Sequence, residues 1–213
     1  MLMKRLFFSL GLSIIVSLLG TTLWGQAISD KKVERDAKKQ AKTLVKEGWA
    51  VAPGHQSIEI QQLRASKLQN SFDEDFNPKY VFGSAQSVAP NYDAAKFQAT
   101  ELAKIEMAGI ISSEVAGLVE TNIGNSQLDP GQAAAIVKTV GDYKSFVASK
   151  LSNVIPVIEM YKTDPKTKNT IVSVGLFYNK EEAVKAGIKA VREQMMKDSE
   201  ELGKELDVIL GIK

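Results

Sequence analysis

The chain has 213 residues, of which 27 are Lys or Arg, 25 are Asp or Glu, one is His and none is Cys. The lack of Cys excludes disulfides, a lipid-bearing cysteine and thiolate metal sites, and the near balance of charge argues against a general electrostatic attraction to nucleic acid or anionic lipid. This length suits one well-buried core, and no low-complexity linker or internal repeat divides it, so we expect a single globular unit.

The first 27 residues have the pattern of a secretory signal peptide. Lys4 and Arg5 form a charged start, residues 6–20 are apolar or small, and small residues precede a cleavage site after Ala27. An uncleaved membrane anchor is the alternative, but the apolar run is shorter than the ~20 residues that a spanning helix needs. We therefore expect export to the periplasm and a mature chain with no stable membrane anchor.

Residues 28–78 are predicted to form an N-terminal helical extension. An amphipathic helix is expected over residues 29–47, with lysines over most of its outer surface and Gly48 at its end. Its narrow apolar stripe consists of Val33, Ala37, Ala41 and Leu44. A short strand or extended arm over residues 49–52 and a weaker helix over residues 57–69 follow.

Residues 79–213 are predicted to form the core. Residues 79–88 are rich in strand formers, and from Tyr92 a long helix places apolar or small residues almost every fourth position. A second helix is expected over residues 130–151, where Asp129 and Pro130 form its start. Its inward residues are Ile136, Val140, Tyr143, Val147 and Leu151.

The last third of the chain predicts an antiparallel hairpin and a helix. Residues 154–162 and 170–178 are strand-like, and Pro156 requires a bulge or an edge position in the first of them. Asn179 is expected to cap one long helix that runs to Ile209, interrupted in its stripe only at Ser199. The members of that stripe are Val184, Ile188, Val191, Met195, Leu202, Leu206 and Ile209.

This order of elements predicts an α+β fold. The core reads β-α-α-β-β-α, a small and mainly antiparallel sheet covered on one face by long helices, with an added N-terminal helix. In the second strand of the hairpin, the alternation of side chains places Phe177 and Tyr178 on opposite faces of the sheet. One of these aromatic sets is therefore either a binding face or, as we favour, is covered by the N-terminal helix.

Part of the core resembles known envelope proteins. The stretch FGSAQSVAPNYDAAKFQATELAKIEMAGIISSEV, within residues 79–178, is similar to small Gram-negative envelope lipoproteins, to the N-terminal domain of flagellar assembly protein T and to uncharacterised exported bacterial proteins. The chain departs from the lipoproteins because it lacks their lipid-bearing Cys. The resemblance implies an accessory or assembly role in the envelope without catalysis, and it carries over no catalytic residue.

Catalytic machinery is not apparent in the sequence. The one His, His55, lies beside a Pro-Gly pair, no GxSxG motif is present, and Ser112 and Ser113 fall within a predicted helix. We interpret His55 as a solvated loop residue. No phosphate-binding loop occurs either, so nucleotide use is unsupported.

A partial calcium-loop pattern is the nearest approach to a metal site. Asp73, Asp75 and Asn77 match the first ligand positions, but Pro78 replaces the required Gly and Ser84 the required Glu. A solvent-exposed acidic turn is the favoured interpretation. Three carboxylates on the long helix, Glu106, Glu114 and Glu120, are too widely spaced for a paired acid and base, and Met195 falls on the core stripe. The sequence therefore predicts no catalytic, cofactor-binding or metal-ligating residue.

Three functions remain in view. We expect an exported, non-catalytic protein of the cell envelope that acts through contacts with another envelope protein, and no role in nucleic-acid binding. The alternative is a periplasmic binder of a small or lipid-like ligand, held in a pocket between the helix layer and the sheet. An enzyme is the least supported of the three.

Overall fold

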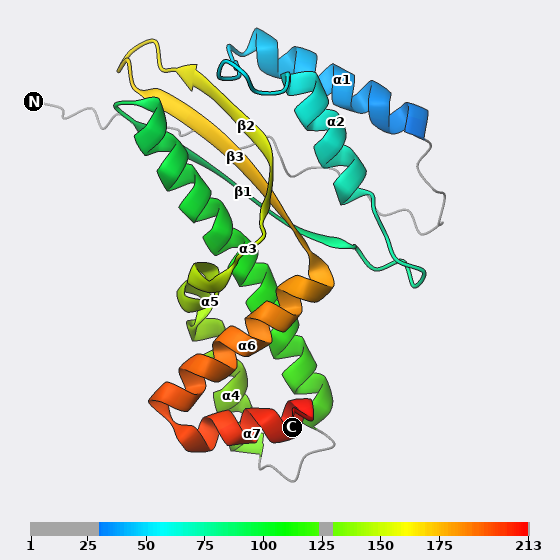
Figure 1. Ribbon diagram of the computed structural model, residues 1–213, viewed down its shortest axis with the longest axis vertical. Coiled ribbons are helices and arrows are strands. Elements are labelled where there is room, and N and C mark those ends of the chain that lie inside the picture. Colours follow the sequence, from blue (N-terminus) through cyan, green and yellow to red (C-terminus); the bar gives the residue numbers. More distant parts are fainter. Residues whose placement is uncertain (1–29, 124–129, 213) are drawn as a thin grey trace, which may run out of the picture.

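The structure, a computed structural model, describes residues 30–123 and 130–212, so the predicted leader and its cleavage site lie outside the described residues. Figure 1 shows an elongated arrangement, with the sheet and two helices at one end and a helical cluster at the other. The elements are α1 (Asp30–Lys46), α2 (Ile58–Gln69), β1 (Tyr80–Ala89), α3 (Tyr92–Ile123), α4 (Pro130–Asp142), α5 (Lys144–Lys150), β2 (Ile155–Thr163), β3 (Thr170–Asn179), α6 (Lys180–Asp198) and α7 (Glu200–Leu210).

The sheet is antiparallel, and its strand order is β1-β3-β2. In the hairpin of β2 and β3 the register shifts between Pro156 and Ile158, so the bulge expected at this proline is present, in an edge strand. Proline is tolerated there because an edge strand leaves half of its N–H groups without a strand partner. The predicted α+β class is therefore confirmed.

Helix α3 lies very close to one face of the sheet. Ala95, Ala99 and Ala103 are fully buried, and a Cβ added to Gly83 of β1 would lie 2.4 Å from the Ala103 carbonyl oxygen. Small side chains on both elements let the backbones approach each other. The same face of β3 carries Tyr178, which is 4 % exposed in this core.

The far half of α3 extends beyond the sheet and is packed by four shorter helices (Figure 1). The single helix expected over residues 130–151 is wrong, because α4 ends at Asp142 and α5 begins at Lys144. Both segments contribute buried side chains to the same core around α3, among them Val140 and Val147. The break redirects the chain so that both helices reach this core.

The expected single C-terminal helix is also divided, at Ser199. The Ser199 N–H donates to the Met195 carbonyl over 2.7 Å, and its hydroxyl accepts the Leu202 N–H over 3.4 Å, so it ends α6 and caps α7. Asn179 caps α6 as predicted, since its side chain accepts the Glu182 N–H. The turn at Ser199 brings α7 back against the core, where Leu206 is fully buried.

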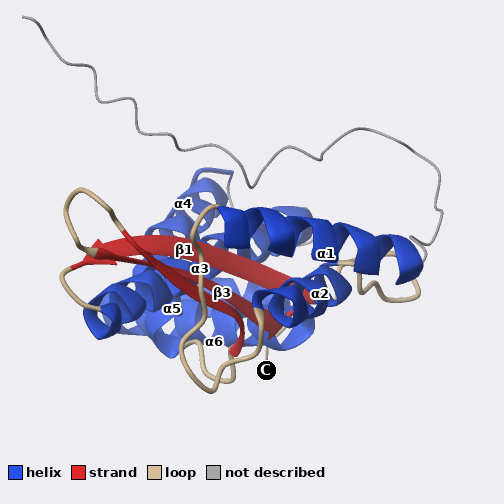
Figure 2. Cartoon of the chain, turned by 90° about the horizontal axis from the view of Figure 1, so that it is seen from above, coloured by secondary structure: helices blue, strands red, loops and turns tan. Residues whose placement is uncertain are grey.

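The second face of the sheet is covered by the N-terminal extension, as favoured, although by two helices and not by one. Phe177 of β3 is fully buried in a cluster with Ala65 of α2, whereas Met160 of β2 packs with Ala41 of α1. Figure 2 shows α1 and α2 together beside the sheet, with α1 at the outer boundary. The face that carries Phe177 is thus occupied by the N-terminal extension, mainly through α2 at that position.

Candidate functional site

A polar cluster forms where three distant segments meet at the edge of the sheet. The Glu159 carboxylate on β2 accepts a hydrogen bond from the Tyr92 hydroxyl, and Glu159 Oε1 lies 2.8 Å from Lys96 Nζ and 3.3 Å from His55 Nδ1. Tyr92 and Lys96 are one turn apart at the start of α3, so both reach the same carboxylate. The Tyr161 ring makes an edge-on contact with the Tyr92 ring.

The protonation states in this cluster follow from its contacts. Burial works to raise the pKa of Glu159, but hydrogen bonds from Lys96 and Tyr92 outweigh it and hold that pKa below its ordinary value. Burial first, and then the hydrogen bond to Glu159, raise the pKa of Tyr92 above its ordinary value. Glu159 is therefore a carboxylate and Tyr92 a protonated phenol at neutral pH.

This arrangement binds segments together and is poorly suited to proton transfer. A general base needs a pKa close to the working pH, and the pKa of Glu159 is shifted away from neutrality. The Glu159 side chain is also only 15 % exposed, and the Tyr92 hydroxyl, the Lys96 ammonium and the His55 ring surround one of its oxygens. The cluster is best described as an ion-pair network that joins the α1–α2 loop, α3 and β2.

Two further contacts fix the N-terminal extension to the free edge of β2. The buried Gln61 side chain of α2 donates to the Glu159 carbonyl over 3.1 Å and accepts the Glu159 N–H over 2.8 Å. Ala50 exchanges two backbone hydrogen bonds of 2.8 Å with Tyr161, so of the short strand or extended arm expected over residues 49–52 the structure shows an arm with a β-bridge. Together they satisfy backbone groups that an edge strand would otherwise expose.

The structure places His55 in a loop, as expected, but gives it a partner. Its ring contacts Glu159 and its side chain is 36 % exposed, so the solvated interpretation is incomplete. The i, i+4 spacing of Tyr92 and Lys96 was visible in the sequence. Nothing local indicated that Glu159, 67 residues after Tyr92, would meet them.

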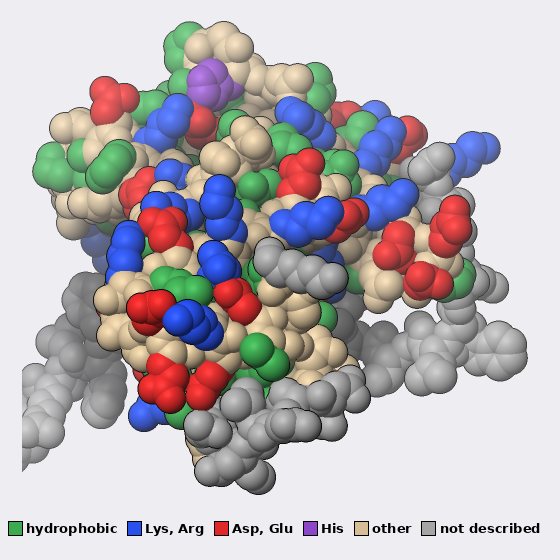
Figure 3. All heavy atoms as spheres, turned by 60° about the horizontal axis from the view of Figure 1, so that its bottom comes forward, with side chains coloured by type: hydrophobic (Ala, Val, Ile, Leu, Met, Phe, Trp, Pro, Cys, Tyr) green, Lys and Arg blue, Asp and Glu red, His purple; other side chains and the backbone are tan. Residues whose placement is uncertain are grey.

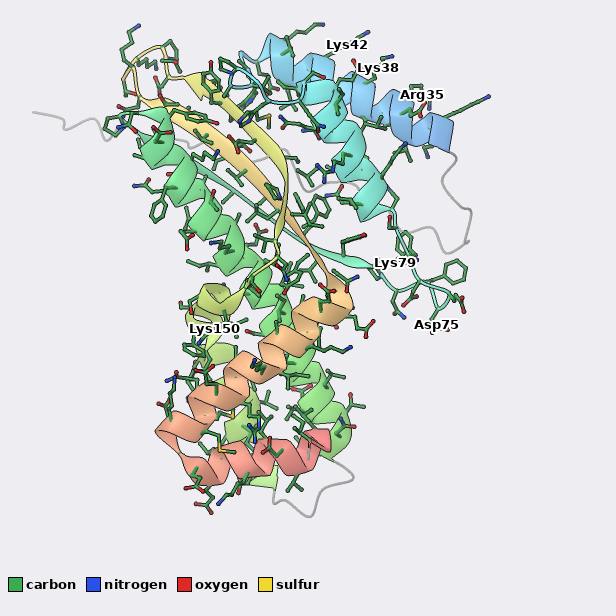
Figure 4. The ribbon with its side chains drawn as sticks, in the orientation of Figure 1. Arg35, Lys38, Lys42, Asp75, Lys79 and Lys150 are labelled. Atoms are coloured by element: carbon green, nitrogen blue, oxygen red, sulfur yellow. The ribbon has the colours of Figure 1, made fainter. Side chains whose placement is uncertain are left out.

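The residues of the partial calcium pattern form a turn that is closed by hydrogen bonds to the Asp73 side chain. The Asp73 carboxylate accepts the backbone N–H groups of Asp75 and Asn77 over 3.0 and 2.7 Å, and the Asn77 side-chain amide over 3.2 Å. The hydrogen bond from the Asn77 backbone is the main cause of the lowered pKa of Asp73. Figure 4 shows Asp75 and Lys79 on the loop between α2 and β1, projecting away from the helices. The oxygens of Asp73 are thus directed at donors within the turn.

The other sequence candidates are not brought together. Glu106 accepts the Ser84 N–H over 2.7 Å, whereas Glu114 pairs with Lys180 over 2.8 Å. The Ser112 hydroxyl is buried and has no hydrogen-bond partner among the described residues, and Ser113 donates to a backbone carbonyl. Met195 is fully buried in the core, as predicted.

A groove of about 580 Å³ lies between α1 and the start of α2. Apolar side chains of Val45, Trp49 and Ile58 line it, together with the charged residues Lys42, Lys46 and Glu59. Val45 is 59 % exposed, whereas Trp49 beside it in the groove is 6 % exposed. The Trp49 ring is held from another side by Lys162, whose Nζ lies 4.5 Å from the ring centroid. The groove therefore has an apolar floor that is largely buried, one exposed apolar side chain at Val45, and two lysines and Glu59 at its rim.

Comparisons with family models, with curated proteins and with solved structures gave no match for this chain. Among the described helices, none combines the length and apolar character that crossing a bilayer requires.

Proposed function

We propose that the chain is a non-catalytic protein of the cell envelope, exported to the periplasm, that acts through contacts with another envelope protein. The groove between α1 and α2 is the observation that carries this proposal. It exposes Val45 next to the largely buried Trp49, and a partner segment would bury this apolar surface. The polar cluster at Glu159 gives no competing catalytic explanation, because its groups are engaged with one another.

The shape of the groove favours a short amphipathic segment of the partner. Grooves between helices commonly receive such segments by their apolar side chains. A tryptophan in a desolvated centre is a frequent energetic anchor of protein interfaces. The neighbouring lysines, Lys42 and Lys46, would favour an acidic flank on the partner.

Photocrosslinking in living cells of the source bacterium tests this proposal. A photoreactive amino acid at Val45 should give one discrete adduct, whereas the same group at Val208, an exposed residue of α7, should give none. With the purified partner, Val45→Glu should weaken binding more than about tenfold, because a charge enters an apolar contact, and Val208→Glu should leave binding unchanged. Equal adducts at both positions, or unchanged binding of the Val45 variant, would contradict a partner in the groove.

A lipid-like ligand is the second candidate, and the same groove favours it by its size. Its volume, about 580 Å³, falls within the range of small-molecule sites. The expected location, between the helix layer and the sheet, is instead closely packed at Gly83 and Ala103. Titration of the exported protein with oleate separates the two functions, because Trp49 lines the groove and reports occupancy by fluorescence. Saturable quenching that Trp49→Phe abolishes would favour the ligand over the protein partner.

A further inference from the structure

The outer face of α1 concentrates most of the positive charge of the extension. Val33, Ala37 and Ala41 are buried and fix the orientation of the helix. At about 100° per residue, the seven basic residues of α1 fall within an arc of about 120° opposite this buried stripe. They are Lys31, Lys32, Arg35, Lys38, Lys39, Lys42 and Lys46, and all are exposed. Glu34 and Asp36 fall outside the arc.

These charges are mostly not neutralised by the rest of the protein. Arg35 Nε lies 3.8 Å from Asp36 Oδ1 and Lys38 Nζ lies 3.4 Å from Glu59 Oε1. The other five make no ion pair with any residue in the described ranges, 30–123 and 130–212. Figure 4 shows Arg35, Lys38 and Lys42 in a row along α1.

The net charge of the whole chain conceals this separation. Helix α1 has seven basic and three acidic residues, whereas the remaining chain after residue 27 has 18 basic and 22 acidic ones. Figure 3, which brings the end with α6 and α7 forward, shows acidic and basic side chains interspersed there. Balance over the chain therefore does not exclude attraction to anionic lipid, because the field near one surface depends on local charge.

We propose that this basic face of α1 docks the protein peripherally on an anionic phospholipid surface. A helix of 17 residues is about 25 Å long and presents its charges in a nearly flat row, which suits a planar array of headgroups. Val45, exposed at the border of the arc, adds an apolar contact at the headgroup level. The arc contains no aromatic side chain on which a nucleic-acid base could stack, so lipid is the favoured polyanion.

The docking face overlaps the groove at Lys42, Val45 and Lys46 but extends beyond it along α1. Arg35 and Lys39 belong to the face and do not line the groove. Variants at these two positions therefore test lipid docking without altering the surface proposed for a protein partner. Lipid docking by α1 is independent of whether a protein segment or a small ligand occupies the groove.

Vesicle co-sedimentation tests the inference. Protein recovered after export is mixed with vesicles of phosphatidylcholine alone or with added phosphatidylglycerol, at low and at high salt. Binding should require phosphatidylglycerol and should be lost at high salt, because screening shortens the range of surface charge. Equal binding to neutral vesicles would overturn the proposal, since it would indicate apolar insertion.

A charge-matched pair of variants sharpens the test. Arg35→Gln with Lys39→Gln should weaken binding about thirtyfold, at about fivefold per charge removed, while glutamine preserves helix propensity. Lys166→Gln with Lys189→Gln removes the same charge elsewhere and should change binding little. Equal loss in both pairs would show that only net charge matters and would overturn the assignment to α1. Binding to duplex DNA but not to anionic vesicles, with the same dependence on Arg35 and Lys39, would overturn lipid as the partner.

Discussion

Glu159 is the residue on which the contacts of the sheet edge converge. Its side chain receives Lys96 and Tyr92 from α3 and His55 from the α1–α2 loop, while its backbone pairs with Gln61. A carboxylate held in this way stabilises the fold only while it is ionised. Its contribution is present above its ordinary pKa and is lost as pH falls through the lower pKa that it has in the folded protein.

We expect Glu159→Gln to lower the free energy of unfolding at neutral pH by about 1–2 kcal/mol, because charge-assisted hydrogen bonds are lost and Lys96, which is 40 % exposed, stays partly solvated. Chemical denaturation measures this. Glu181→Gln is the control, since Glu181 makes an exposed pair with Lys185 one turn away and should leave stability essentially unchanged.

The pH dependence of stability distinguishes a contribution from the charge of Glu159 from a contribution of its packing alone. The difference in stability between the wild type and the Glu159→Gln variant should narrow as pH falls below 4.5, the ordinary value, because the unfolded wild-type chain gains a proton there and the folded protein gains it only at a lower pH. A difference that stays constant from neutral pH into acid would mean that the carboxylate charge contributes nothing.

At the scale of elements, the contact between β1 and α3 determines how closely the main helix approaches the sheet. A Cβ at Gly83 would meet the Ala103 carbonyl oxygen at 2.4 Å and the Met107 nitrogen at 3.0 Å. Both are backbone atoms, so relief requires the helix or strand to shift. The buried alanines of α3 are therefore matched by a glycine on the strand.

Gly83→Ala should accordingly destabilise the protein by about 1–3 kcal/mol, the usual cost of overpacking a core. Gly117→Ala, at a half-buried position of α3, is the control, because nothing lies within 4 Å of its added Cβ. That variant should be neutral or more stable by up to about 1 kcal/mol through better helix propensity. Thermal and chemical unfolding should show that the free energy of unfolding falls in the Gly83 variant and does not fall in the Gly117 variant. Equal destabilisation of the two variants would refute the close approach of α3 to β1.

The sequence predicted which helices and strands exist, but it did not predict that two of the expected helices are each divided in two. Periodicity identified α1, the start of α3 and all three strands, because their apolar patterns match one regular geometry. The breaks at Tyr143 and Ser199 were not predicted, although the missing step of the apolar stripe at Ser199 coincides with one of them. Ser199 caps α7 locally, and contacts between distant residues join the segments around both breaks: the Tyr143 hydroxyl donates to Asp198 over 2.6 Å, and Arg192 donates twice to Asp207. Such partners lie far apart along the chain, so local propensity does not reveal them.

The candidate surfaces were partly visible in the sequence. Lysines over most of the outer surface of the first helix were predicted, but whole-chain neutrality hid their significance. The groove was not predictable, because it depends on how α2 packs against α1 and on where Trp49 is held.

At the scale of the whole molecule, the extension of α1 and α2 is attached to a larger core by a few specific contacts. Its two clusters around Trp49 and Phe177 are small beside the continuous core that surrounds α3. Regions with fewer buried apolar contacts open at lower free energy than the main core. The hydrogen bonds of Gln61 and Ala50 to β2 therefore have a large share in keeping the extension closed.

Gln61→Leu should loosen this attachment without unfolding the core. The variant leaves the N–H and C=O groups of Glu159 unpaired at the strand edge, a cost of about 1–3 kcal/mol, so amide exchange across residues 30–69 should accelerate. Protection in α3 and β3 should stay as in the wild type, because their contacts do not involve Gln61. Gln69→Leu, an exposed change on the same helix, provides the control and should leave exchange unaltered. If Gln61→Leu instead accelerated exchange equally in α3 and β3, the extension and the core would open as one cooperative unit, and the lipid-docking and groove surfaces could not respond independently of the rest of the fold.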